Sequence, residues 1–130
     1  MSQTNTEPRI IVVDDDNDIR NLYSFTLKKH GAQMVGTFSD GREVIEAFRE
    51  DANLADIVII DYRMPGLDGV NAGRIINEIN PRVRLILISA FEILPSTEVF
   101  DQVLKKPISS KELIDAVTSS AMKQAEARHH

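Results

Sequence analysis

Three short runs of apolar residues constrain the fold of this chain more than any other feature. They are Ile10 to Val13, Ile57 to Ile60, and Val83 to Ile88, the last interrupted only by Arg84. Continuous rather than alternating apolar character is typical of strands covered on both faces, as in a parallel sheet between two layers of helices. The runs therefore predict buried, parallel strands.

Helical patterns separate these runs. A first helix is predicted over Asn17 to Lys29, with Gly31 as a stop, and a further strand follows near Gln33 to Thr37. Residues that favour helix N-caps precede the later helical patterns: Ser39 or Asp40, Asp68, and Ser109 with Glu112 in an S-x-x-E capping box. The alternation predicts a doubly wound α/β fold with right-handed crossovers, in which functional groups gather at the carboxyl ends of the strands.

A length of 130 residues fits one domain. We expect residues 1–8 to be a flexible N-terminus and residues 9–122 to form the domain. Residues 123–130 are expected to be a tail, and its last two histidines resemble the remnant of a purification tag. The sequence contains no internal repeat.

Composition excludes several classes of function. Cysteine is absent, so disulfides and thiolate metal sites are excluded, and the net charge of -5 gives no basic surface for nucleic acid. The first residues are polar, and no apolar run approaches the roughly 20 residues that span a bilayer. We therefore expect a cytoplasmic protein without membrane insertion and without direct contact to nucleic acid.

Carboxylates follow two of the apolar runs. Asp14 to Asp16 come directly after the first run, and Asp61 follows the run Ile57 to Ile60. Carboxylates brought together at neighbouring strand ends repel each other, and a hard cation with oxygen ligands relieves that repulsion. Mg²⁺ is the natural candidate, because it binds one or two carboxylates and accepts phosphate oxygens as further ligands. A carboxylate held beside it can act as a nucleophile and form an acyl phosphate.

Two further strand ends carry polar groups. Ser89 follows the fourth strand and offers a hydroxyl, and Lys106 follows a short strand over Val103 to Lys105 and offers a compact positive charge for a phosphate oxygen. Strand alternation turns Lys105 away from the side that Lys106 faces. Pro107 fixes the backbone after this lysine, at a bond where a cis peptide is affordable.

Four segments in this order resemble the receiver domains of bacterial and archaeal response regulators: I-I-V-V-D-D-D, I-I-D-Y-R-M-P-G-L-D-G, I-S-A and K-K-P-I. The resemblance spans about Arg9 to Met122, and D-x-x-M-P-G-x-D-G is its most specific part. It implies a flavodoxin-like fold with a five-stranded parallel sheet in the order 2-1-3-4-5. It also implies a phospho-accepting signalling domain rather than an enzyme.

The same resemblance assigns roles to individual residues and to partners. The donor would be a phosphohistidine of a sensor histidine kinase or histidine phosphotransfer protein, output would pass through a partner protein, and homodimers are compatible with the family. Six residues would form the site: Asp61 as phosphoacceptor, Asp14, Asp15 and the backbone carbonyl of Arg63 with Asp61 as Mg²⁺ ligands, Ser89 as switch hydroxyl, and Lys106 as phosphoryl contact.

The chain departs from the family pattern after Ser89. Lys106 follows by only 17 positions, with Pro95 between, so we expect the fourth helix to be short, irregular or absent. Val103 stands at the position of the usual switch aromatic, so signalling by rotation of a ring is not expected. We expect residues 91–100 to change order or position instead, and Arg63 and Phe91 to shield the phosphoryl group from water.

Other readings of the same residues remain open. Asp14 to Asp16 also match the D-x-D start of haloacid dehalogenase-type phosphohydrolases, although Asp18 stands where that family has threonine or valine. A receiver-like module that interacts without phosphorylation is the second alternative. Asp16 alone is better explained as a helix cap, and His30 as a structural residue that complements a helix carboxyl end.

Overall fold

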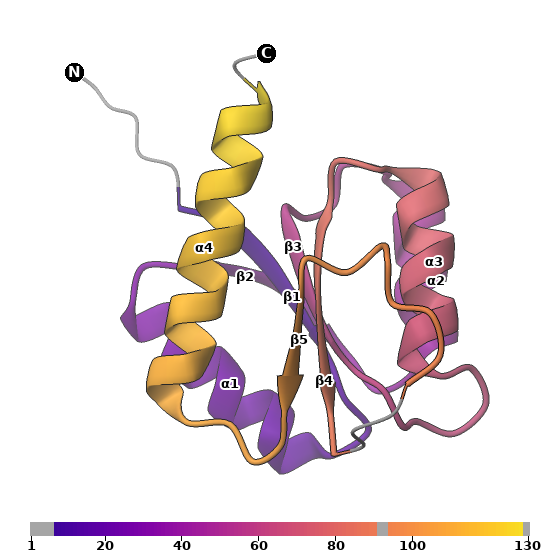
Figure 1. The fold of residues 1–130 in the computed structure, drawn as a ribbon, viewed down its shortest axis with the longest axis horizontal. Helices are drawn as coiled ribbons and strands as arrows, with labels where there is room; N and C mark the ends of the chain where they lie inside the picture. Colours follow the sequence, from indigo (N-terminus) through magenta and orange to yellow (C-terminus); the bar gives the residue numbers. More distant parts are fainter. Residues whose placement is uncertain (1–6, 91–93, 129–130) are drawn as a thin grey trace.

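A computed structural model describes residues 7–90 and 94–128 of the chain, and strands and helices alternate along most of this length (Figure 1). The element order is β1 (Arg9–Val13), α1 (Asn17–Lys29), β2 (Gln33–Phe38), α2 (Gly41–Glu50), β3 (Ile57–Asp61), α3 (Gly69–Ile79), β4 (Arg84–Ser89), β5 (Gln102–Lys105) and α4 (Ser110–Arg128). Each strand expected from an apolar run is present, with bounds that differ by about one residue.

The strands form one parallel sheet in the order β2-β1-β3-β4-β5. This is the flavodoxin-like arrangement that the resemblance to receiver domains implies. Because the strands are parallel, their carboxyl ends meet at one edge of the sheet and their amino ends at the opposite edge. Val13 at the end of β1 pairs with Ile60, and Asp61 pairs with Ile88, so the residues after these strands lie close together.

The predicted helix starts are confirmed by their capping hydrogen bonds. Asp16, Asp40 and Asp68 are the N-caps of α1, α2 and α3, and each side chain accepts a hydrogen bond from a backbone N–H of the first turn. Before α4, Ser109 Oγ accepts from the Glu112 N–H at 3.1 Å and Glu112 Oε1 accepts from the Ser109 N–H at 2.9 Å. This reciprocal pair is the capping box that the sequence predicts.

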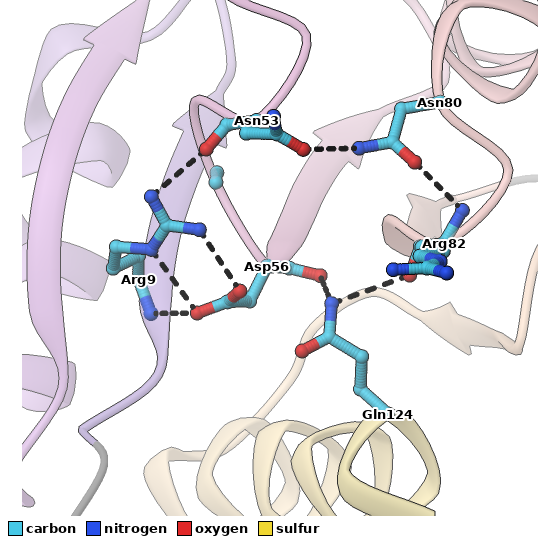
Figure 2. Close-up of a pocket in the computed structure, with 7 residues that line it drawn as sticks. Arg9, Asn53, Asp56, Asn80, Arg82 and Gln124 are labelled. Carbon is cyan, nitrogen blue, oxygen red and sulfur yellow. Dashed lines mark hydrogen bonds and ion pairs between the residues drawn. The ribbon is translucent and has the colours of Figure 1, made fainter. Parts of the chain in front are cut away.

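The last helix is longer than expected. The sequence predicts a tail from residue 123 onward, whereas α4 continues to Arg128. Gln124, only 8% exposed, anchors this extension: its Nε2 donates to the backbone carbonyls of Asp56 and Arg82 at 3.1 and 3.2 Å (Figure 2). The apolar pattern that marks the earlier turns of α4 ends before this residue. The extension is held by a polar contact, which hydrophobic periodicity does not reveal.

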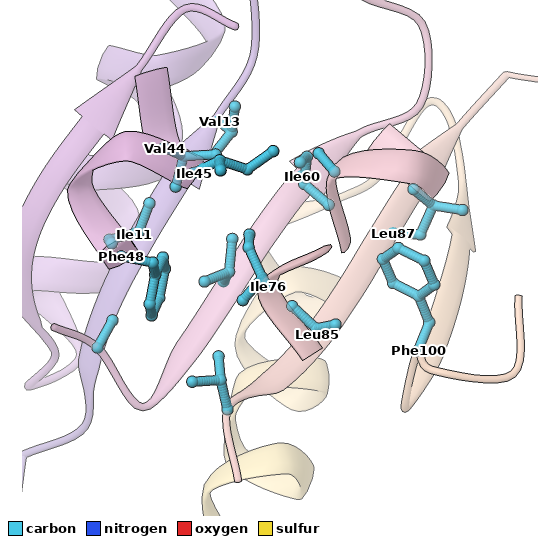
Figure 3. Packing of buried hydrophobic residues seen from close by; sticks show 14 of the residues in the cluster. Ile11, Val13, Val44, Ile45, Phe48, Ile60, Ile76, Leu85, Leu87 and Phe100 are labelled. Carbon is cyan, nitrogen blue, oxygen red and sulfur yellow. The ribbon is translucent and has the colours of Figure 1, made fainter. Parts of the chain in front are cut away.

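Helices cover both faces of the sheet, with α1 and α4 on one side and α2 and α3 on the other (Figure 1). Alternate residues of β1 enter the two cores. Ile11 and Val13 pack beneath α2 and α3 (Figure 3). Ile10 and Val12 pack beneath α1 and α4. All four are buried. Burial on both faces explains why the strands read as continuous apolar runs.

The connection from β4 to β5 contains no helix in its described part, residues 94–101, as expected. Phe100 packs in the α2/α3 core near Leu87 and is 8% exposed (Figure 3). Its ring lies directly against Gly73 of α3, where a Cβ atom would overlap it. Val103 on β5 is 45% exposed. Phe91 lies outside the described residues.

Within residues 7–90 and 94–128, no helix combines the length and apolar character needed to cross a membrane.

Candidate functional site

Three carboxylates meet at the carboxyl edge of the sheet. Asp14 and Asp15 follow β1 and Asp61 ends β3, and one oxygen of each lies within 4.8 Å of the others. Asp14 is 2% exposed and Asp61 is also buried, whereas Asp15 is exposed. Asp16, which follows Asp15 in the sequence, caps α1 and belongs to the helix start. The predicted convergence of strand-end carboxylates is therefore present.

Lys106 supplies the positive charge of the site. Its Nζ lies 2.8 Å from Asp61 Oδ1 and 3.9 Å from Asp14 Oδ2. Its backbone N–H donates to the Ser89 carbonyl at 2.9 Å, which fixes the turn after β5, and the following bond to Pro107 is cis. Lys105 is exposed, in agreement with the predicted alternation along the strand.

Ser89 and Arg63 occupy less central positions. Ser89 ends β4, is buried, and pairs in register with Lys105 of β5, so it lies one strand beyond Asp61 in the sheet. Arg63 lies in the loop after β3 and its side chain is exposed. Both residues lie at the carboxyl edge, where the sequence predicts them.

The loop after Asp61 folds back tightly onto the strand end. Gly69 N–H donates to the Tyr62 carbonyl at 2.8 Å, and a Cβ atom at Gly69 would overlap the backbone carbonyl of Asp61. Gly66, in the same loop, has a φ of 78°, a left-handed conformation that glycine adopts without a steric penalty. The D-x-x-M-P-G-x-D-G segment therefore packs the start of α3 against the backbone of Asp61.

Burial and mutual repulsion disturb the carboxylates. Burial raises the pKa of Asp14 from its ordinary 3.8 to about 6, and the charges of Asp61 and Asp15 add to this, against the lowering effects of the Asp16 N–H and Lys106. Burial also raises the pKa of Asp61, although its hydrogen bond to Lys106 opposes the shift. For Lys106, burial lowers the pKa, but the hydrogen bond and attraction to Asp61 outweigh it and the net shift is upward. The site thus holds more negative charge than its surroundings stabilise.

Two neighbours of the site were not predicted from the sequence. Arg20 of α1 donates through Nη1 to the backbone carbonyl of Asp14 at 2.6 Å and through Nη2 to Asn17 Oδ1 at 3.0 Å. Tyr23 is buried in the core of α1 and α4, and burial raises its pKa while the charge of Lys106 lowers it. The contact between Arg20 and Asp14 is indicated in the sequence only by the position of Arg20 in the first turns of the helix that follows the acidic cluster.

The donor set fits a hard divalent cation. Mg²⁺ binds oxygens at about 2.0–2.1 Å in an octahedron, so its ligand oxygens lie about 3–4 Å apart. The oxygens of Asp14, Asp15 and Asp61 already lie within 4.8 Å of one another, so small side-chain rotations bring them onto one ion. A divalent charge also relieves the repulsion that raises the pKa of Asp14. These three side chains could therefore hold Mg²⁺.

Comparison with known proteins gives a consistent picture. Residues 10–118 match the family model of the response regulator receiver domain. The chain is 33% identical to the chemotaxis protein CheY of Bacillus subtilis over 82 residues, which are 63% of this chain and 67% of that protein. It is 28% identical to the response regulator receiver protein CpdR of Brucella abortus over 84% of this chain and 92% of the relative.

Solved structures agree with the sequence comparison. A response regulator receiver domain protein from Clostridium thermocellum is 28% identical, with a TM-score of 0.84 over 92% of this chain and 98% of that one. The sheet order and the helices on both faces are those of this fold. The chain belongs to the response regulator receiver domain family.

Proposed function

We propose that this receiver domain accepts a phosphoryl group on Asp61 and acts as a phosphorylation-dependent switch. The observation that carries the proposal is the meeting of Asp14, Asp15 and Asp61 within 4.8 Å, with Lys106 Nζ 2.8 Å from Asp61. The donor is a phosphohistidine of a sensor histidine kinase or histidine phosphotransfer protein. The output is a changed affinity for a downstream protein partner.

In the proposed reaction, a carboxylate oxygen of Asp61 attacks phosphorus while the phosphorus–nitrogen bond of the donor breaks. The electron pair of that bond stays with the imidazole, which takes a proton from solvent, and an acyl phosphate is left on Asp61. Asp14, Asp15, Asp61 and the Arg63 carbonyl would hold Mg²⁺, which would supply charge neutralisation for the phosphoryl oxygens. Lys106 moves from the Asp61 carboxylate to a phosphoryl oxygen, for which its compact charge and rotatable donors suit it.

The proposed signal starts at Ser89 and reaches the β4–β5 connection. Ser89 turns its hydroxyl toward the phosphoryl group, and residues 94–101 then shift on α3, where Phe100 seals the core against Gly73. Val103 offers no ring that could rotate in its place. Amide hydrogen exchange of residues 94–101 should therefore change when the phosphoryl mimic beryllofluoride is added with Mg²⁺. Unchanged exchange in this segment would contradict this route.

The central test is intact-mass spectrometry after incubation with acetyl phosphate and Mg²⁺. We expect a gain of one phosphoryl group in the native chain, none without Mg²⁺, and none in Asp61→Asn. A matched control is Asp51→Asn, which alters an exposed carboxylate far from the site and should leave the gain intact.

A second variant tests the lifetime of the acyl phosphate. In the same time course, Arg63→Ala should shorten the half-life of the acyl phosphate if the Arg63 side chain shields it from water.

A receiver-like module that signals without phosphorylation is the second candidate, favoured by the lack of a helix in residues 94–101 and by the exposed Val103. For this candidate, the intact-mass experiment should show no phosphoryl group on the chain. The absence of any mass gain, together with the absence of Mg²⁺ binding, would select this candidate over the phosphorylated switch.

A further inference from the structure

A small polar cavity lies at the amino edge of the sheet, opposite the acidic cluster. It has a volume of about 80 Å³ and lies where β1 and β3 begin, beside the loop before β4 and the last turns of α4 (Figure 2). The polar residues around it are Arg9, Asn53, Asp56, Asn80, Arg82 and Gln124. None of them takes part in the proposed phosphoryl chemistry.

Most of the wall is held in place by its own hydrogen bonds. Arg9 forms an ion pair with Asp56, with Nη2 3.2 Å from Oδ1, and its Nη1 donates to the Asn53 carbonyl at 2.8 Å. The Arg9 backbone N–H donates to Asp56 Oδ2 at 2.9 Å. Asn80 Nδ2 donates to the Ala52 carbonyl at 2.8 Å. These contacts fix the shape of the cavity before any ligand enters.

Two groups of the wall lack a partner among residues 7–90 and 94–128. Gln124 is more than nine-tenths buried, and both bonds to its amide nitrogen are made, but its Oε1 accepts no hydrogen bond. Figure 2 shows this oxygen turned toward the side of Arg9 and Asp56. Arg82 is an exposed residue of the wall, and its guanidinium has no carboxylate partner among these residues. The cavity therefore presents an acceptor and an uncompensated positive charge.

Charge and size restrict the ligand. Arg9 and Asp56 offset each other, so Arg82 leaves the cavity positive in a chain of net charge -5. Gln124 Oε1 can accept a hydrogen bond from a donor on the same ligand. A water molecule needs about 10–15 Å³ of such volume, so the cavity holds roughly five to eight waters, or a ligand of about five heavy atoms.

We propose that this cavity is a binding site for a small oxyanion that carries a hydroxyl group, such as monohydrogen phosphate or a two-carbon hydroxy acid. The anionic oxygens face Arg82 and the hydroxyl donates to Gln124 Oε1. The bound ligand joins the starts of β1 and β3 to the extension of α4, and so stabilises the C-terminal turns of that helix.

The test is a titration of the ¹⁵N-labelled full chain without Mg²⁺ at constant ionic strength, with inorganic phosphate, glycolate, acetate or chloride. We expect saturable shifts of the backbone amides of Arg9, Asp56 and Arg82 and of the Gln124 side-chain amide with phosphate or glycolate. Acetate has the charge but no hydroxyl donor and should bind about fivefold more weakly. Phosphate alone or glycolate alone would identify which oxyanion geometry the site takes.

Arg82→Gln should weaken the binding about tenfold, the usual effect of losing one charge-assisted hydrogen bond. Arg49→Gln is the matched control, because it removes one exposed positive charge elsewhere and should leave the affinity unchanged. Shifts that do not saturate, that are equal in Arg82→Gln, or that centre on Lys106 would overturn the proposal and leave a cavity that holds water only.

Discussion

Buried carboxylates are paired with a cation at the amino edge of the central sheet, whereas they are crowded together at its carboxyl edge. At the amino edge, Asp56 accepts from the Arg9 backbone and is paired with the Arg9 guanidinium. At the carboxyl edge, Asp14 and Asp61 are buried beside Asp15, and Lys106 is the cation that contacts both buried carboxylates. Burial and repulsion raise the pKa of Asp14 to about 6, whereas the Asp56 carboxylate is satisfied by its neighbours.

This difference separates an edge whose buried carboxylate is neutralised by the fold from an edge whose buried carboxylates repel one another. The amino edge stabilises the fold, because its buried carboxylate, Asp56, meets partners that are fixed by the same fold. The carboxyl edge is strained electrostatically in the metal-free chain, and that strain is relieved by a cation or a proton. Substitutions at the two edges should therefore change the free energy of unfolding in opposite directions.

Asp56→Ala should produce the largest change, a loss of about 3 kcal/mol in the free energy of unfolding. It removes the partner of the Arg9 guanidinium and leaves the Arg9 backbone N–H without its acceptor at a mostly buried position. Urea denaturation measures the loss. Glu46→Ala, which breaks an exposed ion pair with Arg49, is the control and should cost less than about 0.5 kcal/mol. Equal losses in the two variants would contradict the structural role of the amino edge.

Asp14→Asn should stabilise the metal-free chain at pH 8 by about 2 kcal/mol. The pKa of Asp14 is about 6 in the folded chain against an ordinary value of 3.8, so its folded form holds the proton more tightly. The stabilisation that the protonated Asp14 carboxyl group gives the folded chain is therefore complete below pH 4 and is lost as the pH rises through 6. The stability advantage of Asp14→Asn over the native chain should appear over this pH range and vanish below it. Thermal unfolding from pH 3.5 to 8 measures the difference.

Asp15→Asn is the matched control for this experiment, because its carboxylate is exposed and its removal should shift stability by less than about 0.5 kcal/mol. Added Mg²⁺ should make the native chain more stable than Asp14→Asn at pH 8. It should raise the free energy of unfolding of the native chain and have little effect on that of Asp14→Asn. A destabilised Asp14→Asn chain in the absence of metal would show that the carboxyl edge is not strained.

The contrast between the edges was only partly predictable from the sequence. Apolar runs followed by acidic residues predicted both the sheet and the meeting of Asp14 with Asp61, because parallel strands end at one edge. The contact between Phe100 and Gly73 was not predictable, since it joins a loop to a helix through a shape that neither residue type specifies. Gln124 was missed for a related reason: it anchors α4 by hydrogen bonds, and the expected end of that helix rested on apolar periodicity.

Arg20→Gln should give the smallest effect and tests whether the carboxyl edge has a fixed support of its own. The guanidinium holds the Asp14 backbone carbonyl at 2.6 Å and Asn17 at 3.0 Å, so its loss should loosen the acidic loop without removing a ligand. We expect Mg²⁺ affinity to fall about fivefold, less than the effect usually seen when a direct partner of a metal ligand is removed. Isothermal titration with Mg²⁺ measures this change. Lys28→Gln, on an exposed turn of the same helix, should leave the affinity unchanged. If both variants lose Mg²⁺ affinity equally, the effect is one of net charge and the bond to Asp14 has no positioning role. If only Arg20→Gln loses affinity, the carboxyl edge holds its acidic loop in place before the cation binds.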